Sequence, residues 1–123
     1  MARIIAIDDD KNWLNILTLI LKNANHEVFP LESGEKIIEE IKKHTPDIVM
    51  IDTMMPGISG GAVYQIIRKE IGYHIPIIIC SVSKLKISQF KDTLLAYCLK
   101  PVDNENLLQT IQKLLEAKKT IDD

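Results

Sequence analysis

The sequence IIAIDDD, residues 4–10, passes from four apolar residues directly into three acidic ones. The apolar part does not alternate with polar residues, which is typical of a parallel strand buried on both faces of its sheet. Carboxylates that follow such a strand repel one another and lose contact with water, so their pKa values rise unless a cation compensates them. The stretch therefore predicts a buried strand that ends at a charged site.

Similar apolar runs recur along the chain and alternate with stretches of helical period. The apolar runs cover residues 4–7, 28–31, 48–51, 77–80 and 94–99, and the second is weakened by Pro30. Apolar residues at three- and four-residue steps indicate one-sided helices at 13–24, 37–41, 62–67 and 107–115. The alternation predicts an α/β fold, a single doubly wound (βα)5 domain whose parallel five-stranded sheet is covered by helices on both faces.

The composition fits one folded domain, residues 1–123, with 46% hydrophobic and 26% charged residues. The formal net charge of −2 and the lack of a dense Lys/Arg cluster argue against nucleic acid as a direct partner. The first residues do not have the apolar segment and cleavage site of a signal peptide, and no apolar run is long enough to span a bilayer. We therefore expect a cytoplasmic location and no membrane partner.

The two cysteines and the C-terminal segment complete this outline. Cys80 and Cys98 lie within apolar runs and lack the spacing of a metal or redox motif, so we expect reduced core thiols. The last helix is expected at Asn104–Glu116, followed by a short tail at 117–123. We therefore expect no output domain.

Polar side chains follow four of the predicted strands, each at the point where the strand ends. They are Asp8 and Asp9 after the first apolar run, Asp52 after the third, Ser81 after the fourth and Lys100 after the fifth. Parallel strands point the same way, so these side chains are expected at one edge of the sheet, where ligands bind in open α/β proteins. Each position alone has an ordinary explanation, such as a helix cap or a solvated lysine, but together they predict a shared site.

The residue types at this edge favour metal-assisted phosphoryl chemistry. Converging carboxylates suit a hard divalent ion, and Mg²⁺ accepts one or two of them while keeping waters and phosphate oxygens. Zinc is not expected, because no His or Cys stands at these positions. A carboxylate beside Mg²⁺ can attack phosphorus, and Asp52 is the favoured nucleophile because its strand has neighbours on both sides. Lys100 would supply a second positive charge and Ser81 a hydroxyl donor.

Four segments, AIDDD, IVMIDTMMPGISGG, IIICSVSK and YCLKP, resemble the receiver domain of two-component response regulators, the family of the chemotaxis protein CheY. The resemblance spans the chain from Arg3 to about Leu115. It implies a flavodoxin-like, CheY-like sheet with strand order 2-1-3-4-5. It also implies a phosphoacceptor signalling protein that catalyses only its own phosphorylation and dephosphorylation, and that takes its phosphoryl group from a histidine kinase or a phosphotransfer protein.

The resemblance also implies a phosphoacceptor and a metal site. Asp52 matches the phosphoacceptor and also contributes to the Mg²⁺ site. Mn²⁺ can replace Mg²⁺ in that site. Asp8 and Asp9 match the acidic pair of the metal site, Asp9 as the direct ligand and Asp8 acting through water. The main-chain carbonyl of Met54 matches the remaining protein ligand.

Further positions match the switch of the family. Ser81 matches the hydroxyl that turns toward the phosphoryl oxygens, and Lys100 matches the phosphate-binding lysine. Tyr97 matches the aromatic residue that changes rotamer with the hydroxyl, although a partly buried core tyrosine explains it equally well. Pro101 matches the proline whose bond to the lysine is usually cis.

The chain departs from the family between Ser81 and Lys100, where it is a few residues shorter and lacks the usual Gly-containing turn. This predicts a short or irregular fourth helix around Ile87 to Thr93. The departure matters because the family's usual output surface, toward a downstream protein, is made by the fourth helix, fifth strand and fifth helix.

Other functions were weighed against this one. Asp8 and Asp10 form a DxD similar to that of haloacid-dehalogenase-type phosphatases, but no later acidic pair and no cap follow. A degenerate receiver that binds partners constitutively would typically lack one of the chemical positions. A flavodoxin relative would need a Ser/Thr/Gly-rich phosphate loop where this chain has acids.

Overall fold

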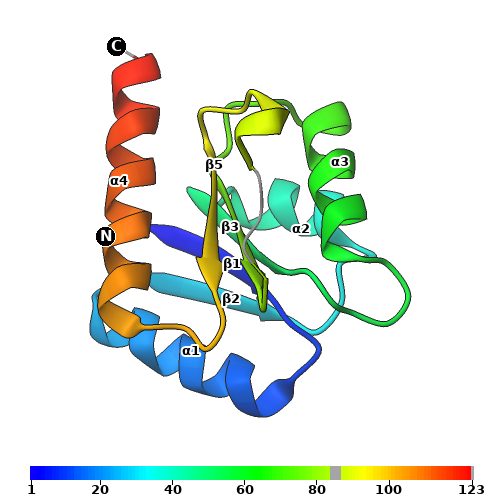
Figure 1. Cartoon of the computed structure of the whole chain (residues 1–123), viewed down its shortest axis with the longest axis vertical. Coiled ribbons are helices and arrows are strands. Elements are labelled where there is room, and N and C mark those ends of the chain that lie inside the picture. The colour runs from blue at the N-terminus through cyan, green and yellow to red at the C-terminus, as the bar shows by residue number, and fades with distance from the viewer. Residues whose placement is uncertain (84–86, 123) are drawn as a thin grey trace.

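A computed structural model describes residues 1–83 and 87–122, with side chains for all of these except 87, 88 and 122. Five parallel strands form one sheet in the order β2-β1-β3-β4-β5 (Figure 1). The strands are β1 (Arg3–Ile7), β2 (Glu27–Leu31), β3 (Ile48–Asp52), β4 (Ile77–Ser81) and β5 (Leu95–Leu99). The helical elements are α1 (Lys11–Asn23), α2 (Ile37–His44), α3 (Gly60–Glu70), the 3-10 turn η1 (Ile87–Phe90) and α4 (Asn104–Asp122). The α/β class and the strand order predicted from the sequence are confirmed.

The helices cover the two faces of the sheet in pairs (Figure 1). Leu14, Leu17 and Leu21 of α1 share one core cluster with Leu107 and Ile111 of α4. The other face packs α2 and α3 in a second cluster, which includes Ile37, Ile41, Val63 and Ile67. Successive residues of a strand point alternately into the two clusters. Both faces of the central strands are therefore buried, so the apolar residues of these strands form continuous runs and do not alternate with polar ones.

The burial of each strand follows its place in the sheet. β3 and β4 are buried along their whole length, and β1 is buried except at Arg3, where it begins. β2 lies at an edge, and there Pro30 is tolerated because an edge strand has ladder positions that need no N–H donor. The weak apolar pattern of 28–31 is thus the pattern of an edge strand.

Two helices begin at side-chain caps, and the cap of α1 follows directly on the polar end of β1. Asp10 accepts hydrogen bonds from the main-chain N–H groups of Asn12 (3.0 Å) and Trp13 (3.2 Å). Ser59 accepts one from Ala62 N at 3.2 Å, at the start of α3. Asp10 is therefore the N-cap of α1, which separates its role from that of the two acids before it.

The structure corrects the expected end of the last helix. Instead of stopping at Glu116, α4 continues to Asp122, so the expected tail at 117–123 is helical through Asp122. The residues after Glu116 include Ala117, Lys118 and Lys119, which favour helix, and no Gly or Pro ends it. Lys119 in the last turn also interacts favourably with the helix dipole.

The predicted irregular fourth helix is confirmed as a 3-10 turn. η1 spans only Ile87–Phe90, and the chain reaches β5 through Lys91, whose φ of 49° is left-handed. The rest of the expected segment, 91–93, is not helical. Residues 84–86, just before it, lie outside the described residues. Within the described residues, the helical elements are thus four α-helices and this 3-10 turn.

We predict that alkaline pH destabilises the fold through its buried thiol and phenol. Burial raises the pKa of the Cys80 thiol to about 12, and burial together with a hydrogen bond to Asp92 raises that of Tyr64 to about 12. Above about pH 9 the unfolded chain releases these protons while the folded chain retains them, so the free energy of unfolding falls as pH rises. Urea unfolding at about pH 8 and pH 10.5 should show a lower midpoint at the higher pH. Cys80→Ala should reduce that difference, and an unchanged difference would contradict the assignment to Cys80.

Candidate functional site

The carboxyl ends of four strands bring the predicted polar residues to one edge of the sheet. Asp8 follows β1, Asp52 and Ser81 end β3 and β4, and Lys100 follows β5. Asp8, Asp52 and Ser81 are only 4–5% exposed, although each is polar. Asp9 is exposed. This edge therefore combines buried and accessible carboxylates, as a site open to solvent on one side requires.

Three carboxylates and one ammonium meet here. Oxygen atoms of Asp8, Asp9 and Asp52 all lie within 4.8 Å of one another. Lys100 Nζ donates a hydrogen bond to Asp52 Oδ1 and lies 3.5 Å from Asp8 Oδ2. The formal charges of these groups leave two negative charges uncompensated, which matches the charge of one divalent cation.

The pKa values at the site reflect burial and crowding. Burial raises the pKa of the Asp8 carboxyl above its usual range, and the negative charge of Asp52 adds to this, although a hydrogen bond from Asp10 N at 2.9 Å opposes it. Burial acts to lower the pKa of Lys100, but its hydrogen bond to Asp52 and the charge of Asp8 outweigh this and raise it. Lys100 is thus held protonated beside the Asp52 side chain. The three acids offer only oxygen ligands, a set that fits Mg²⁺ rather than a softer metal.

The backbone around Asp52 is fixed by two residues that the sequence analysis did not single out. Thr53 donates from both its main-chain N and its Oγ1 to the carbonyl of Cys80, each at 3.1 Å, and so joins the ends of β3 and β4. At Gly60, where α3 begins, an added Cβ would lie 2.3 Å from the carbonyl oxygen of Asp52. In the sequence, only the Ser59-Gly60 pair at the start of a predicted helix could have indicated this close approach of α3 to Asp52.

The remaining predicted residues lie around this cluster. Ser81 Oγ accepts a hydrogen bond from Ser83 N at 3.1 Å. Met54 is 76% exposed in the loop after β3, and Tyr97 on β5 is half-buried. The Lys100–Pro101 peptide bond is cis, the form that the resemblance implies.

We expect Asp8→Asn to stabilise the metal-free protein while weakening metal binding. The substitution removes one of the crowded charges yet keeps an oxygen to accept from Asp10 N, so the free energy of unfolding should rise by roughly 1 kcal/mol in the presence of a chelator. Mg²⁺ affinity should fall about 10- to 100-fold.

Thermal unfolding with a chelator and with Mg²⁺ measures both effects of Asp8→Asn. Asp10→Asn is the matched control, because Asn is an equally good N-cap and Asp10 stands outside the cluster. Destabilisation of Asp8→Asn without metal would contradict the account.

Comparison with known proteins defines the class. A family model described as the response regulator receiver domain matches residues 4–112, and the chain belongs to this family. Protein PilH of Pseudomonas aeruginosa is 32% identical over 119 residues, which cover 94% of this chain and 98% of PilH.

Solved structures agree with this assignment. A protein assigned as a response regulator from Chloroflexus aurantiacus is 27% identical, with a TM-score of 0.82 over 94% of this chain and 98% of that one. The chemotaxis protein CheY4 of Vibrio cholerae has the same TM-score at 23% identity, over 93% and 98% of the two chains, and shares the fold. Within the part of the chain that the structure describes, no helix is long and apolar enough to cross a membrane.

Proposed function

We propose that Asp52 accepts a phosphoryl group from the phosphohistidine of a histidine kinase or phosphotransfer protein, and that this modification switches a protein-interaction surface. The observation that carries the proposal is the pairing of the Lys100 ammonium with the Asp52 carboxylate beside two further acids. A lysine needed only for stability would not require the acids to crowd at the same edge. The arrangement instead supplies a nucleophile, a cation site and a fixed positive charge.

The acidic cluster would hold the metal. Asp9 and Asp52 would supply carboxylate ligands to Mg²⁺ or Mn²⁺, and Asp8 would act through water. The main-chain carbonyl of Met54 would complete the protein ligands. When bound, the ion neutralises charge on the phosphoryl oxygens and on the acids.

Transfer to Asp52 needs only the phosphorylated donor, and the later hydrolysis needs only water. An Asp52 carboxylate oxygen attacks phosphorus, the phosphorus–nitrogen bond of the donor breaks, and its electron pair stays on the imidazole nitrogen. Lys100, displaced from Asp52 Oδ1, pairs with a phosphoryl oxygen and stabilises the negative charge that develops there. Attack of water on phosphorus later releases phosphate and restores the carboxylate.

The switch follows from the new partners that the phosphoryl group offers. In our proposal the Ser81 hydroxyl leaves the Ser83 N–H and donates to a phosphoryl oxygen, and Tyr97 on β5 changes rotamer in response. The affected surface is made by η1, β5 and α4, where Phe90 and Leu99 are already 50% and 40% exposed. A downstream protein would bind there.

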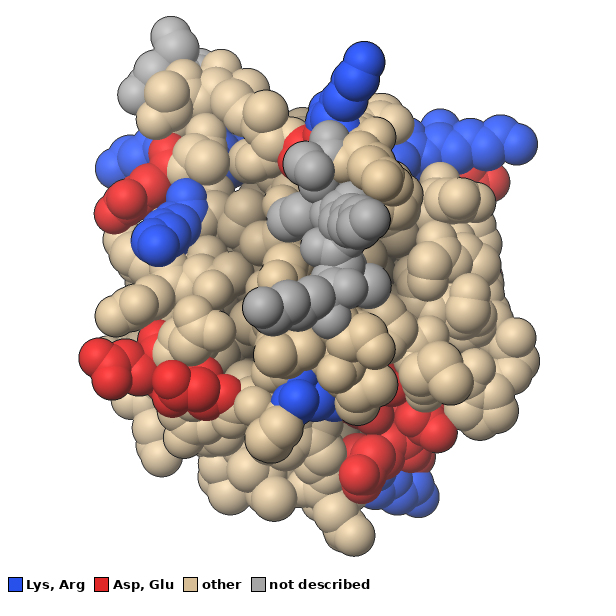
Figure 2. Space-filling model, in the orientation of Figure 1, with Lys and Arg blue, Asp and Glu red and all other residues tan. Residues whose placement is uncertain are grey.

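The charge distribution agrees with a protein partner rather than a nucleic acid. Figure 2 shows acidic and basic side chains interspersed on the visible face, without a continuous field of Lys and Arg that could follow a phosphate backbone. We propose no direct contact with nucleic acid or with a membrane.

Intact mass spectrometry tests the proposal directly. Incubation with acetyl phosphate and Mg²⁺ should add one phosphoryl group to the chain, and a chelator should prevent the gain. If Mg²⁺ binds, as shown by a shift in thermal unfolding, but no mass is gained, the chain is a constitutive interaction module and phosphoacceptance is rejected.

A further inference from the structure

β5 poses a problem of register. Within the described residues it is an edge strand that pairs only with β4, and its sequence from Leu94 to Leu99 is apolar throughout. A shift of one residue would replace apolar side chains with other apolar side chains, so the hydrophobic pattern specifies the register only weakly. Yet Lys100 follows this strand directly, and such a shift would move it by about 3.3 Å along the sheet.

A buried ion pair stands where β5 begins. Arg68 of α3 donates from Nε to Asp92 Oδ2 at 2.8 Å, and the two side chains are only 3% and 2% exposed. Tyr64 donates its hydroxyl to the same Asp92 oxygen at 2.6 Å. Arg68 Nη1 donates to the carbonyls of Gly72 at 3.0 Å and Ile75 at 2.6 Å, so both charges have several partners.

This ion pair holds the residue that begins the β4–β5 ladder. Leu94 N donates to Asp92 Oδ1 at 3.1 Å, and the Leu94 carbonyl accepts from Arg68 Nη2 at 3.3 Å. The same carbonyl accepts from Ile77 N of β4 at 2.8 Å. Asp92 and Arg68 therefore fix both polar groups of Leu94 where the ladder starts.

Burial of the pair favours a role in specificity over one in stability. Two charges removed from water gain little over apolar residues of similar volume, because desolvation offsets their attraction. Hydrogen bonds to one defined main-chain residue, however, distinguish the correct register from a shifted one. The pair is reached from η1 through Lys91, whose left-handed backbone leads into Asp92.

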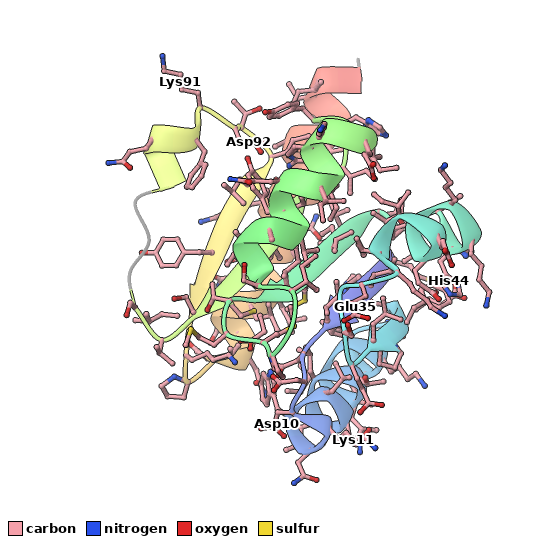
Figure 3. All side chains as sticks on the ribbon, turned by 90° about the vertical axis from the view of Figure 1, so that its right-hand side faces the viewer. Asp10, Lys11, Glu35, His44, Lys91 and Asp92 are labelled. Atoms are coloured by element: carbon pink, nitrogen blue, oxygen red, sulfur yellow. The ribbon has the colours of Figure 1, made fainter. Side chains whose placement is uncertain are left out.

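We propose that the Arg68–Asp92 pair sets the register of β5 and thereby positions Lys100 at Asp52, an inference that rests on the proposed role of Lys100. The pair acts along the strand and not by contact. Figure 3 shows Asp92 at one end of the molecule and Asp10, the residue after Asp8 and Asp9, at the other. At the carboxyl end, Lys100 N donates to Ser81 O at 2.7 Å, which continues the register set at Leu94.

A double-mutant cycle separates positioning from general stability. The rate of mass gain from acetyl phosphate and Mg²⁺ is measured for Asp92→Asn, Lys100→Ala and both together. Asp92→Asn should slow the reaction about tenfold when Lys100 is present and leave it nearly unchanged when Lys100 is absent. Tyr64→Phe is the matched control, because it removes one hydrogen bond to Asp92 and keeps both charges, and its rate should stay within about twofold of the unsubstituted chain. Equal slowing by Asp92→Asn in both backgrounds would show a merely structural role and overturn the proposal.

A second variant covers the case in which Asp92→Asn does not fold. The double substitution Arg68→Met with Asp92→Leu removes both buried charges and fills the space, so it should remain folded. It should still lose about tenfold in rate, whereas an unchanged rate in this folded variant would overturn the proposal.

Nuclear magnetic resonance tests the register without relying on phosphorylation. In the unsubstituted chain, through-space contacts should connect Ile77 with Leu95 and Cys80 with Cys98, which are paired across β4 and β5. These contacts should weaken or shift in the double variant, and their persistence would overturn the proposal. If the unsubstituted chain gains no phosphoryl group at all, the proposed function fails while these contacts still decide the role of the pair.

Discussion

Asp52→Asn is expected to gain no phosphoryl group under conditions in which the unsubstituted chain gains one. The substitution keeps the size of the side chain and an oxygen for the Lys100 ammonium, but the amide is a far poorer nucleophile than a carboxylate. Because the two remaining acids still offer oxygen ligands, the variant should retain weakened Mg²⁺ binding. The measurement is intact mass after incubation with acetyl phosphate and Mg²⁺, alongside the Mg²⁺-dependent shift in Tm.

Asp8→Asn completes this experiment, because it separates the two candidate nucleophiles. If Asp52 is the acceptor, Asp8→Asn should gain mass slowly at low Mg²⁺ and recover as Mg²⁺ is raised. A gain that survives in Asp52→Asn and is lost in Asp8→Asn at every Mg²⁺ concentration would transfer the nucleophile to Asp8. That result would support the phosphatase-like chemistry of the DxD motif made by Asp8 and Asp10.

Gly60→Ala is expected to destabilise the protein by roughly 2–4 kcal/mol, a large effect for one methyl group. The added Cβ would lie 2.3 Å from Asp52 O and 2.9 Å from Thr53 Cα, and these are backbone atoms of the β3 end that cannot rotate away. Either α3 or the end of β3 has to shift, so phosphoryl acceptance should slow as well. Urea unfolding and the rate of mass gain measure the two effects.

The neighbouring glycine provides a matched control. A Cβ at Gly61 would meet nothing within 4 Å. Gly61→Ala should therefore stabilise α3 by about 0.5–1 kcal/mol and leave the reaction rate unchanged. Similar stability for the two variants would contradict the close approach of α3 to the main chain of Asp52.

The sheet and its polar edge could be predicted because they depend on signals that lie within single segments. The apolar runs at 4–7, 48–51 and 77–80 are uniform, and their uniformity reflects burial on both faces. Parallel direction then places Asp8 and Asp52 at one edge without any knowledge of distances. Even the 3-10 turn η1 was foreseeable, from a connection too short for the usual helix.

Contacts between distant segments could not be predicted in the same way. Arg68 of α3 and Asp92 of the loop before β5 look like ordinary charged surface residues in the sequence. Only the packing of α3 against the start of β5 buries them together. The end of α4 was misjudged for a different reason: the apolar period fades after Leu115, but helix propensity continues the helix without it. Burial and helix formation are separate properties, and periodicity reports only the first.

The long final helix makes this protein convenient to immobilise. α4 has nineteen residues and so measures about 28 Å, whereas a five-residue strand such as β5 measures about 16 Å. Its last turns rise past the sheet at the end opposite the carboxylates, as Figure 1 shows, and Ile121 there is 56% exposed. A biotin or fluorophore coupled to a cysteine introduced at Ile121 would leave the carboxyl edge of the sheet facing the solution, so that binding of the proposed phosphodonor protein at that edge could be followed on a sensor surface.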